Sequence, residues 1–132
     1  YLVRAALDES IPVVSLPGPS AVLVALTVSG LPANRFAFEG FLPRKKGRKK
    51  LIEELGEEKR TIVLFESSHR IAKTLNELYQ VMGARKAVLA RELTKIHEEV
   101  IRGTLENLAA ITDEQKLKGE ITLVIAGVPR DL

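Results

Sequence analysis

Residues 61–83 read TIVLFESSHRIAKTLNELYQVMG, and this stretch carries the clearest signal of the fold class. It opens with residues 61–65, a β-branched and apolar run typical of a strand that is buried on both faces. Apolar residues then recur at helical spacing, at Ile71, Leu75, Leu78 and Met82. Gly83 follows at a position where helices commonly stop. The stretch therefore predicts a buried strand, a polar connection and an amphipathic helix, which together form the repeating unit of an α/β sheet.

The same alternation of strand and helix continues on both sides of this unit. Further strands are predicted at residues 11–16, 36–41, 87–90, 100–102 and 121–126. Further helices are predicted at residues 2–9, 21–28, 51–55 and 105–111. Ser68 is expected to cap the helix that begins near Ile71. Thr104 is expected to cap the helix at residues 105–111. Pro32 and Asn34 interrupt two structured stretches, so a boundary is predicted near residues 31–35.

Composition limits the class of protein. The chain has 132 residues, of which 45% are hydrophobic and 28% charged, as in a soluble globular protein of about one domain. It has no cysteine, which excludes disulfides and thiolate metal sites and is compatible with the reducing cytosol. No apolar run approaches the about 20 residues that a membrane span needs, and no signal peptide is recognisable. Because the chain opens at Tyr1 in a helix already under way and its one methionine is Met82, we expect a piece of a longer protein.

Three polar segments follow predicted strands, where the loops of an open α/β sheet bind ligands. In the first, residues 17–20, backbone amides and a hydroxyl at a helix N-terminus can hold an anionic group. The alternative is a rigid turn with an N-cap. The second, residues 66–70, is either a functional loop or a turn in which Glu66 pairs with Arg70 and His69 faces solvent. The third, residues 91–99, is either functional or a solvated charged loop.

Several chemistries find no support in these segments. The two histidines, His69 and His97, lie in different loops and lack the spacing of a metal site. The motifs of nucleophilic catalysis and of glycine-rich nucleotide-binding loops are also missing. Residues 44–50 contain six basic side chains in seven, which suits the phosphates of a nucleic acid or a mobile solvated loop. Phenylalanines precede this run at strand spacing, so we expect them in the core rather than as stacking platforms for bases. They are Phe36, Phe38 and Phe41.

Five motifs, in this order, closely resemble one bacterial family. They are LPGPSA at 16–21, FEGFLP at 38–43, FESSHR at 65–70, RELTKIHEE at 91–99 and RGT at 102–104. The family is that of the methyltransferases I, which methylate ribose 2′-hydroxyls of ribosomal small-subunit RNA. The likeness covers nearly the whole chain, with one departure at Ser68, where the family usually has proline.

The resemblance implies a tetrapyrrole methylase-like α/β fold of two domains, with S-adenosylmethionine in the cleft between them. Residues 1–32 would be the end of the N-terminal domain, and residues 33–132 the C-terminal methylase domain with a mixed sheet. The early strands and the acidic cofactor loop of the first domain would lie upstream of Tyr1. The implied reaction is methyl transfer to the ribose 2′-hydroxyl of a cytidine in small-subunit ribosomal RNA, in the cytoplasm, by a homodimer without membrane contact.

The resemblance also assigns roles to residues. The cofactor would contact Pro17, Gly18, Ser20, Ala21, Glu66, Leu93, Ile121 and Thr122. Candidates for assisting deprotonation of the 2′-hydroxyl are Glu92, Lys95 and His97, and no metal is implied. The RNA would contact Arg44, Lys45, Lys46, Arg48, Lys49, Lys50, His69, Arg70 and Arg91. Two other hypotheses remain open, namely a catalytically silent RNA-binding module and a methylase acting on tetrapyrroles or other small molecules.

Overall fold

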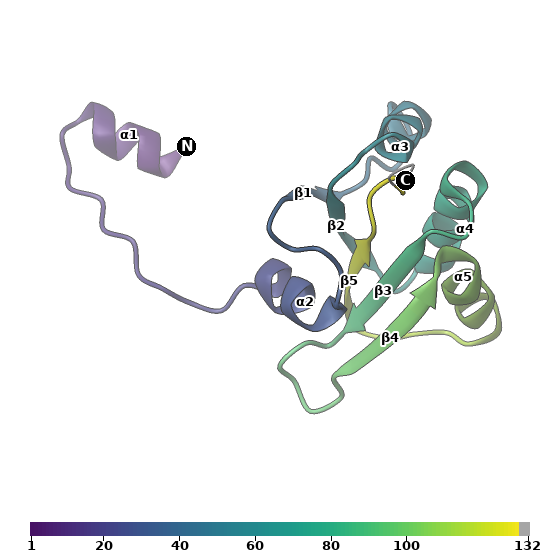
Figure 1. The fold of residues 1–132 in the computed structure, drawn as a ribbon. Helices are drawn as coiled ribbons and strands as arrows, with labels where there is room; N and C mark the ends of the chain where they lie inside the picture. Colours follow the sequence, from purple (N-terminus) through teal and green to yellow (C-terminus); the bar gives the residue numbers. More distant parts are fainter. Residues whose placement is uncertain (130–132) are drawn as a thin grey trace.

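One mixed sheet organises the protein in a computed structural model that describes residues 1–129 (Figure 1). Its strands are β1 (Phe36–Phe41), β2 (Thr61–Ser67), β3 (Lys86–Arg91), β4 (Glu99–Thr104) and β5 (Glu120–Ile125). They lie in the order β1-β2-β5-β3-β4. Strands β1 and β2 are parallel, whereas β5 runs antiparallel to both β2 and β3, and β4 antiparallel to β3. The expectation of an α/β fold with a mixed sheet is confirmed.

Helices cover both faces of this sheet unequally. They are α1 (Leu2–Asp8), α2 (Ala21–Ser29), α3 (Arg48–Gly56), α4 (Ile71–Met82) and α5 (Leu105–Glu114). Helices α3, α4 and α5 lie on one face and α2 on the other, while α1 stands apart at the end of an extended segment (Figure 1). Among residues 1–129, no helix is both long and apolar enough to cross a membrane.

Alternation along the strands divides the core into two clusters. In β2, Ile62 and Leu64 point toward α3, α4 and α5 and belong to the larger cluster. Val63 points to the other face, where Ala25 and Leu26 of α2 pack on it. All three β2 side chains are at most 1% exposed. The prediction of a strand buried on both faces is therefore confirmed, because each face has its own helical cover.

Helix ends were predicted with mixed success. Thr104 caps α5 as expected, and its side chain forms a reciprocal capping box with Asn107. Gly30, with φ of 71°, ends α2. The expectation for Ser68 was wrong, because it lies in a turn and α4 has Arg70 at its N-cap without a side-chain cap. The predicted helix at 51–55 begins earlier, so the second half of the basic run is helical.

The strand predicted at residues 11–16 does not form. The segment is extended but pairs with no strand in the described part of the chain, and Val14 and Leu16 are 81% and 83% exposed. A strand is defined by hydrogen bonds to a neighbour, which its own sequence does not supply. The segment links α1 to the N-terminus of α2 (Figure 1).

Candidate functional site

The second and third polar loops meet at one edge of the sheet. Strands β2 and β3 both end there, and β5, which lies between them, begins there. In the register, Ser67 lies opposite Glu120 and Arg91 opposite Ile121. The chain thus brings residues 66–70, 91–99 and 120–122 together, and we refer to this side of the sheet as the carboxyl edge.

Glu66 is the most buried charged group at the carboxyl edge, with 2% of its surface exposed. One carboxylate oxygen accepts a hydrogen bond from the backbone N–H of Ser67 at 2.7 Å and lies 3.1 Å from Nε of Arg70. The other accepts the hydroxyl of Thr74 at 2.7 Å. Glu66 therefore pairs with Arg70, as the turn interpretation of this loop describes. Nη1 of Arg70 is buried with no hydrogen-bond partner among residues 1–129, so it can donate to an anionic group.

A hydrogen-bonded chain joins Glu66 to the basic run. Arg48 donates to the hydroxyl of Thr74 at 2.8 Å and to the backbone carbonyl of Pro43 at 3.1 Å. It also forms an ion pair of 2.6 Å with Glu77 of α4. Arg48 is only 7% exposed, so its guanidinium contacts other protein groups rather than solvent. Its expected place among the RNA contacts stays a prediction that this burial does not favour, because Glu77, Thr74 and the Pro43 carbonyl engage most of its N–H donors.

The third loop holds a compact charged cluster. Nζ of Lys95 lies 3.3 Å from the Glu92 carboxylate and 3.0 Å from that of Glu120. The backbone N–H of Glu120 also donates to Glu92, at 2.8 Å. That backbone bond, followed by the Lys95 ammonium, lowers the pKa of Glu92 below its usual range. The two carboxylates raise the pKa of Lys95, first through Glu120. At neutral pH Glu92 is thus ionised and Lys95 protonated.

The backbone around this cluster is unusual. Glu92 and Thr94 have φ angles of 51° and 65°, in the left-handed region that side chains other than glycine seldom adopt. Gly119, with φ of 91°, lies so close that an added Cβ would be 2.3 Å from a carboxylate oxygen of Glu92. Residues held in such conformations are concentrated at functional sites. The geometry supports the functional interpretation of this loop, although its outer side is solvated.

Other predicted residues of these loops are placed differently. Arg91 lies 3.2 Å from the Glu99 carboxylate and donates to the carbonyl of Lys118 at 3.0 Å. His69 and His97 are both exposed. His97 is not part of the cluster of Glu92 and Lys95. Among the described residues no group of three or more side chains is arranged to hold a metal ion.

The predicted cofactor residues divide between the two faces of the sheet. Ile121 points to the α4 face with Glu66, whereas Thr122 and the half-buried Leu93 lie on the α2 face. Ser20 caps α2, as the alternative of a rigid turn with an N-cap describes, since its hydroxyl accepts the N–H of Leu23 at 3.4 Å. Pro17 and Gly18 are exposed in the extended segment before it, and Ala21 is exposed in the first turn of α2. The structure therefore gathers only part of this set at the carboxyl edge.

The basic run 44–50, also expected to contact RNA, follows β1, which is parallel to β2 and therefore ends at the same edge of the sheet. Arg44, Lys45 and Lys46 are exposed in the loop before α3. In α3 itself, Lys49 and Lys50 are exposed and lie 3.8 and 3.7 Å from glutamates one turn further on. Together with Arg44, Lys45 and side chains of α4, Lys49 lines a hollow of about 460 Å³ between α3 and α4.

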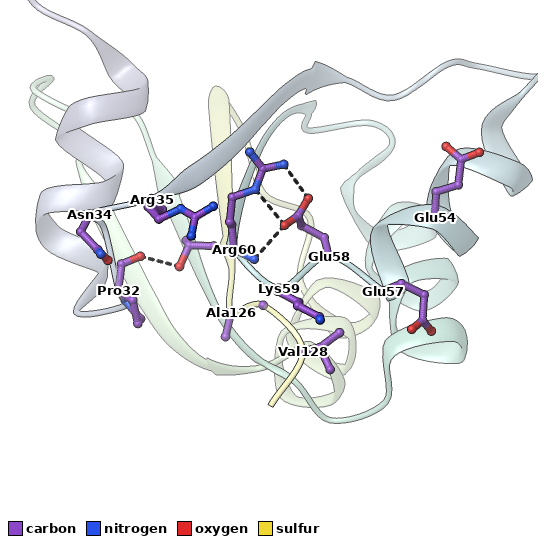
Figure 2. Close-up of a pocket in the computed structure, with 12 residues that line it drawn as sticks. Pro32, Asn34, Arg35, Glu54, Glu57, Glu58, Lys59, Arg60, Ala126 and Val128 are labelled. Atoms are coloured by element: carbon purple, nitrogen blue, oxygen red, sulfur yellow. Dashed lines mark hydrogen bonds and ion pairs between the residues drawn. The ribbon is translucent and has the colours of Figure 1, made fainter. Parts of the chain in front are cut away.

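A larger hollow, of about 850 Å³, lies at the opposite edge of the sheet (Figure 2). Arg60 there donates to both carboxylate oxygens of Glu58, at 2.9 and 2.8 Å, and this pairing lowers the pKa of Glu58 to about 2. Three separate segments of the chain line the hollow, and they contain Arg35, Lys59 and Gly127, respectively. Sequence reasoning missed it because no single segment carries a motif, and it contains none of the predicted site residues.

The fold and the carboxyl edge define an α/β protein whose loops converge beside a mixed sheet. A family model described as Tetrapyrrole (Corrin/Porphyrin) Methylases matches residues 1–109. The chain belongs to this family.

Curated relatives give a more specific comparison. Proteins named Ribosomal RNA small subunit methyltransferase I are similar to this chain in Mycobacterium tuberculosis (54% identity), Xylella fastidiosa (50%) and Thermotoga maritima (44%). Each match covers 96% of this chain, but 45%, 48% and 57% of the respective relative. The chain thus spans about half the length of the curated relatives it matches.

Solved structures share the fold at low sequence identity. Diphthine synthase superposes with a TM-score of 0.68 at 20% identity, over 95% of this chain and 53% of that one. Cobalt precorrin-4 methyltransferase gives 0.65 at 16%, over 94% and 56%. Uroporphyrin-III C-methyltransferase from Thermus thermophilus, complexed with S-adenosyl homocysteine, gives 0.62 at 21%, over 94% and 57%. The predicted tetrapyrrole methylase-like fold is confirmed.

Proposed function

We propose that this chain is the C-terminal portion of an enzyme that transfers a methyl group from S-adenosylmethionine to the ribose 2′-hydroxyl of a cytidine in small-subunit ribosomal RNA. The observation that carries the proposal is the 54% identity, over 96% of the chain, to a protein named Ribosomal RNA small subunit methyltransferase I. Residues 1–32 would then complete an N-terminal domain, and residues 33–132 would form the C-terminal methylase domain.

The residues at the carboxyl edge fit one side of a cofactor site. Residues 17–19 offer exposed backbone before the cap of α2, and Leu93 and Thr122 line the sheet face that α2 covers. Nη1 of Arg70 is a buried donor with no partner in residues 1–129, suited to a carboxylate or phosphate. The Glu66 carboxylate already accepts three hydrogen bonds or ion-pair contacts, so we assign it to holding Arg70 and α4 in place.

When bound, S-adenosylmethionine supplies an electrophilic methyl group, so the protein mainly aligns the 2′-oxygen and assists its deprotonation. Lys95 is protonated at neutral pH and therefore suits donation to the ribose or a phosphate rather than the role of base. Glu92 is ionised and has one carboxylate oxygen without a hydrogen-bond donor among residues 1–129, so it can accept a proton. His97, exposed in the same loop, remains the second candidate for the base.

The RNA strand would lie against exposed cations. We assign Arg44, Lys45, Lys46, Lys49 and Lys50 to its phosphates, because contacts of this kind give salt-dependent affinity without sequence preference. His69 and Arg91 lie at the carboxyl edge and would contact the strand near the target nucleotide. Arg48 is left out of this set because its guanidinium is buried.

A methyl-transfer assay tests the proposal. The chain is joined to the portion of the Mycobacterium tuberculosis relative that it does not cover, and is offered labelled S-adenosylmethionine with both ribosomal subunits. We expect label in small-subunit RNA, mapped by mass spectrometry to a cytidine 2′-O-methyl group, and loss of label when Glu92→Gln and His97→Gln are combined. Transfer to no RNA by a folded protein would contradict it, and would favour the silent RNA-binding module.

A tetrapyrrole acceptor is the second candidate, favoured by the likeness to methyltransferases of corrin and porphyrin synthesis. Those likenesses are at 16% and 21% identity, far below that of the RNA methyltransferase relatives. The exposed cations at residues 44–46 suit the phosphates of a nucleic acid. Adding a tetrapyrrole to the same assay separates the two functions.

We further infer that the enzyme is a homodimer and works in the cytoplasm, where ribosomal RNA is found. Apolar side chains on α1 and in the extended segment support self-association, since Leu2, Val14 and Leu16 are each at least 80% exposed. Sedimentation of the joined protein should give twice the mass of one chain. A monomer at high concentration would contradict the inference.

A further inference from the structure

Aromatic side chains of β1 form an exposed surface that the assigned residues leave unused. Phe38 and Phe41 are 49% and 59% exposed, contrary to the expectation that they lie in the core. The ring of Phe65 lies between them, with centroids 5.1 Å from Phe38 and 5.7 Å from Phe41, in edge-on and tilted arrangements. Of the three phenylalanines of β1, only Phe36 is half-buried, against the cluster beneath α2, and Phe65 of β2 is half-buried as well. We call Phe38, Phe41 and Phe65 the aromatic surface.

A β-bulge creates this surface. Phe38 and Phe41 are three positions apart, so in a regular strand they would point to opposite faces. The pairing with β2 shifts between Phe38 and Gly40, so that Phe38 lies opposite Val63 and Phe41 opposite Phe65. Gly40 has a φ of 62°, in the left-handed region that glycine adopts without strain. The extra residue therefore turns both rings to the same face of the sheet, as bulges beside functional sites often do.

Positive charge follows the aromatic surface along the chain, at the edge of the sheet where β1 is the outermost strand. Strand β1 ends at Phe41 and leads to exposed Arg44, Lys45 and Lys46. Three residues of chain span at most about 10 Å, so the first cation lies within one or two nucleotides of the rings. Aromatic rings beside a basic segment are the composition of sites for single-stranded nucleic acid, in which rings stack on bases and cations contact phosphates. A second copy of this chain would bring the same cations and repel them.

We propose that the aromatic surface stacks one or two unpaired nucleobases of the RNA whose phosphates lie against residues 44–46. The proposal rests on the proposed function and deepens it, because it makes the substrate an unpaired strand at this point. Bases in a duplex stack on each other, and a protein reaches their faces only when they are splayed out.

Binding of two RNA probes to the full 132-residue chain tests the proposal. One is a labelled single-stranded RNA of about 12 nucleotides, and the other is an abasic strand of the same length. Replacing both rings, by Phe38→Ala with Phe41→Ala, should raise the Kd for the normal strand about tenfold and leave the Kd for the abasic strand unchanged. Leu23→Ala, an exposed apolar truncation on α2, is the matched control and should change neither.

A cation variant separates the two contributions. Lys45→Gln with Lys46→Gln should weaken binding of both probes and reduce the dependence of affinity on salt. Equal affinity of the unmodified chain for normal and abasic strands would overturn the stacking proposal. The proposal would also be overturned by a ring variant that binds the normal strand as tightly as the unmodified chain does. The same holds if the ring variant loses self-association in sedimentation but keeps its affinity for RNA.

Folding of the ring variant is checked by circular dichroism and thermal unfolding. If the double alanine variant unfolds, Phe41→Leu keeps the apolar contact with Phe65 but removes one ring, and should still weaken binding of the normal strand alone. Failure of stacking is distinguishable from failure of the proposed function. Methyl transfer to small-subunit RNA without a difference between the two probes overturns only the stacking proposal.

Discussion

Arg48 and Lys49 are neighbours in one basic run, yet their surroundings give them different roles. The Arg48 guanidinium contacts Thr74 and Glu77 and is almost fully buried. The Lys49 side chain is 92% exposed, and its ammonium lies 3.8 Å from Glu53. Charge count alone cannot separate the two, because burial depends on where α3 begins and on how it packs against α4. The sequence thus predicted a basic segment correctly but not which of its members faces solvent.

This difference predicts effects of unequal size for two matched substitutions. Arg48→Met leaves the buried Thr74 and the half-buried Glu77 without their donor, and should lower the free energy of unfolding by about 2 kcal/mol. Lys49→Met removes only an exposed pair and should change it by less than about 0.5 kcal/mol. Urea unfolding followed by circular dichroism measures both. Equal effects would contradict the buried role of Arg48.

Gly119 is predicted to be sensitive to the smallest side chain. In Gly119→Ala the new Cβ would meet the Glu92 carboxylate at 2.3 Å, in addition to the strain of a φ of 91°. Gly47→Ala is the matched control, since φ there is 81° but nothing lies within 4 Å of the added Cβ. Both should lose about 1 kcal/mol to backbone strain, and Gly119→Ala should lower the melting temperature further and displace Glu92. Equal melting temperatures would contradict the close approach.

The cluster of Glu92, Lys95 and Glu120 holds the third loop against the start of β5. The pKa of Glu92 is lowered, so its contribution is complete above the unfolded value of 4.5 and is lost as pH falls through the lower folded value. The pKa of Lys95 is raised, so its contribution is complete below 10.5 and is lost as pH rises through the higher folded value. The cluster therefore stabilises the loop at every pH between 4.5 and 10.5.

NMR titration of the two side chains checks this prediction. The midpoint of the Glu92 carboxyl carbon should lie below 4.5 and that of the Lys95 Cε above 10.5. Glu120→Gln should bring the Lys95 midpoint closer to its reference value, because Glu120 is the largest cause of that shift. Midpoints at the reference values in the unmodified chain would show that the cluster does not form in solution.

The elements that sequence predicted well are those with local signals. Helical spacing identified α4, and the cap at Thr104 identified the start of α5. Residues 11–16 look like a strand, but pairing depends on a neighbour that their own pattern does not reveal. Glu92 and Glu120 are 28 positions apart, and only the register of β3 and β5 brings them together. The bulge at Gly40, which exposes Phe41, is likewise a property of the pairing with β2.

At the scale of the molecule, the carboxyl edge holds the second and third polar loops, and α2 extends from the sheet toward the exposed segment and α1 (Figure 1). The predicted cofactor residues lie on both faces of the sheet, and the chain spans 45% of its Mycobacterium tuberculosis relative. This arrangement fits a cofactor site to which the described residues contribute one side. The rest would come from the portion of the relatives that this chain does not match.

Calorimetric titration of S-adenosylmethionine shows whether the uncovered portion of the relatives completes the cofactor site. It is carried out on the 132-residue chain and on the same chain joined to the uncovered portion of its Mycobacterium tuberculosis relative. We predict saturable binding by the joined protein, at least tenfold tighter than by the chain alone, and weakened by Arg70→Gln. If the joined protein is folded and takes up no S-adenosylmethionine, the carboxyl edge is not part of a cofactor cleft.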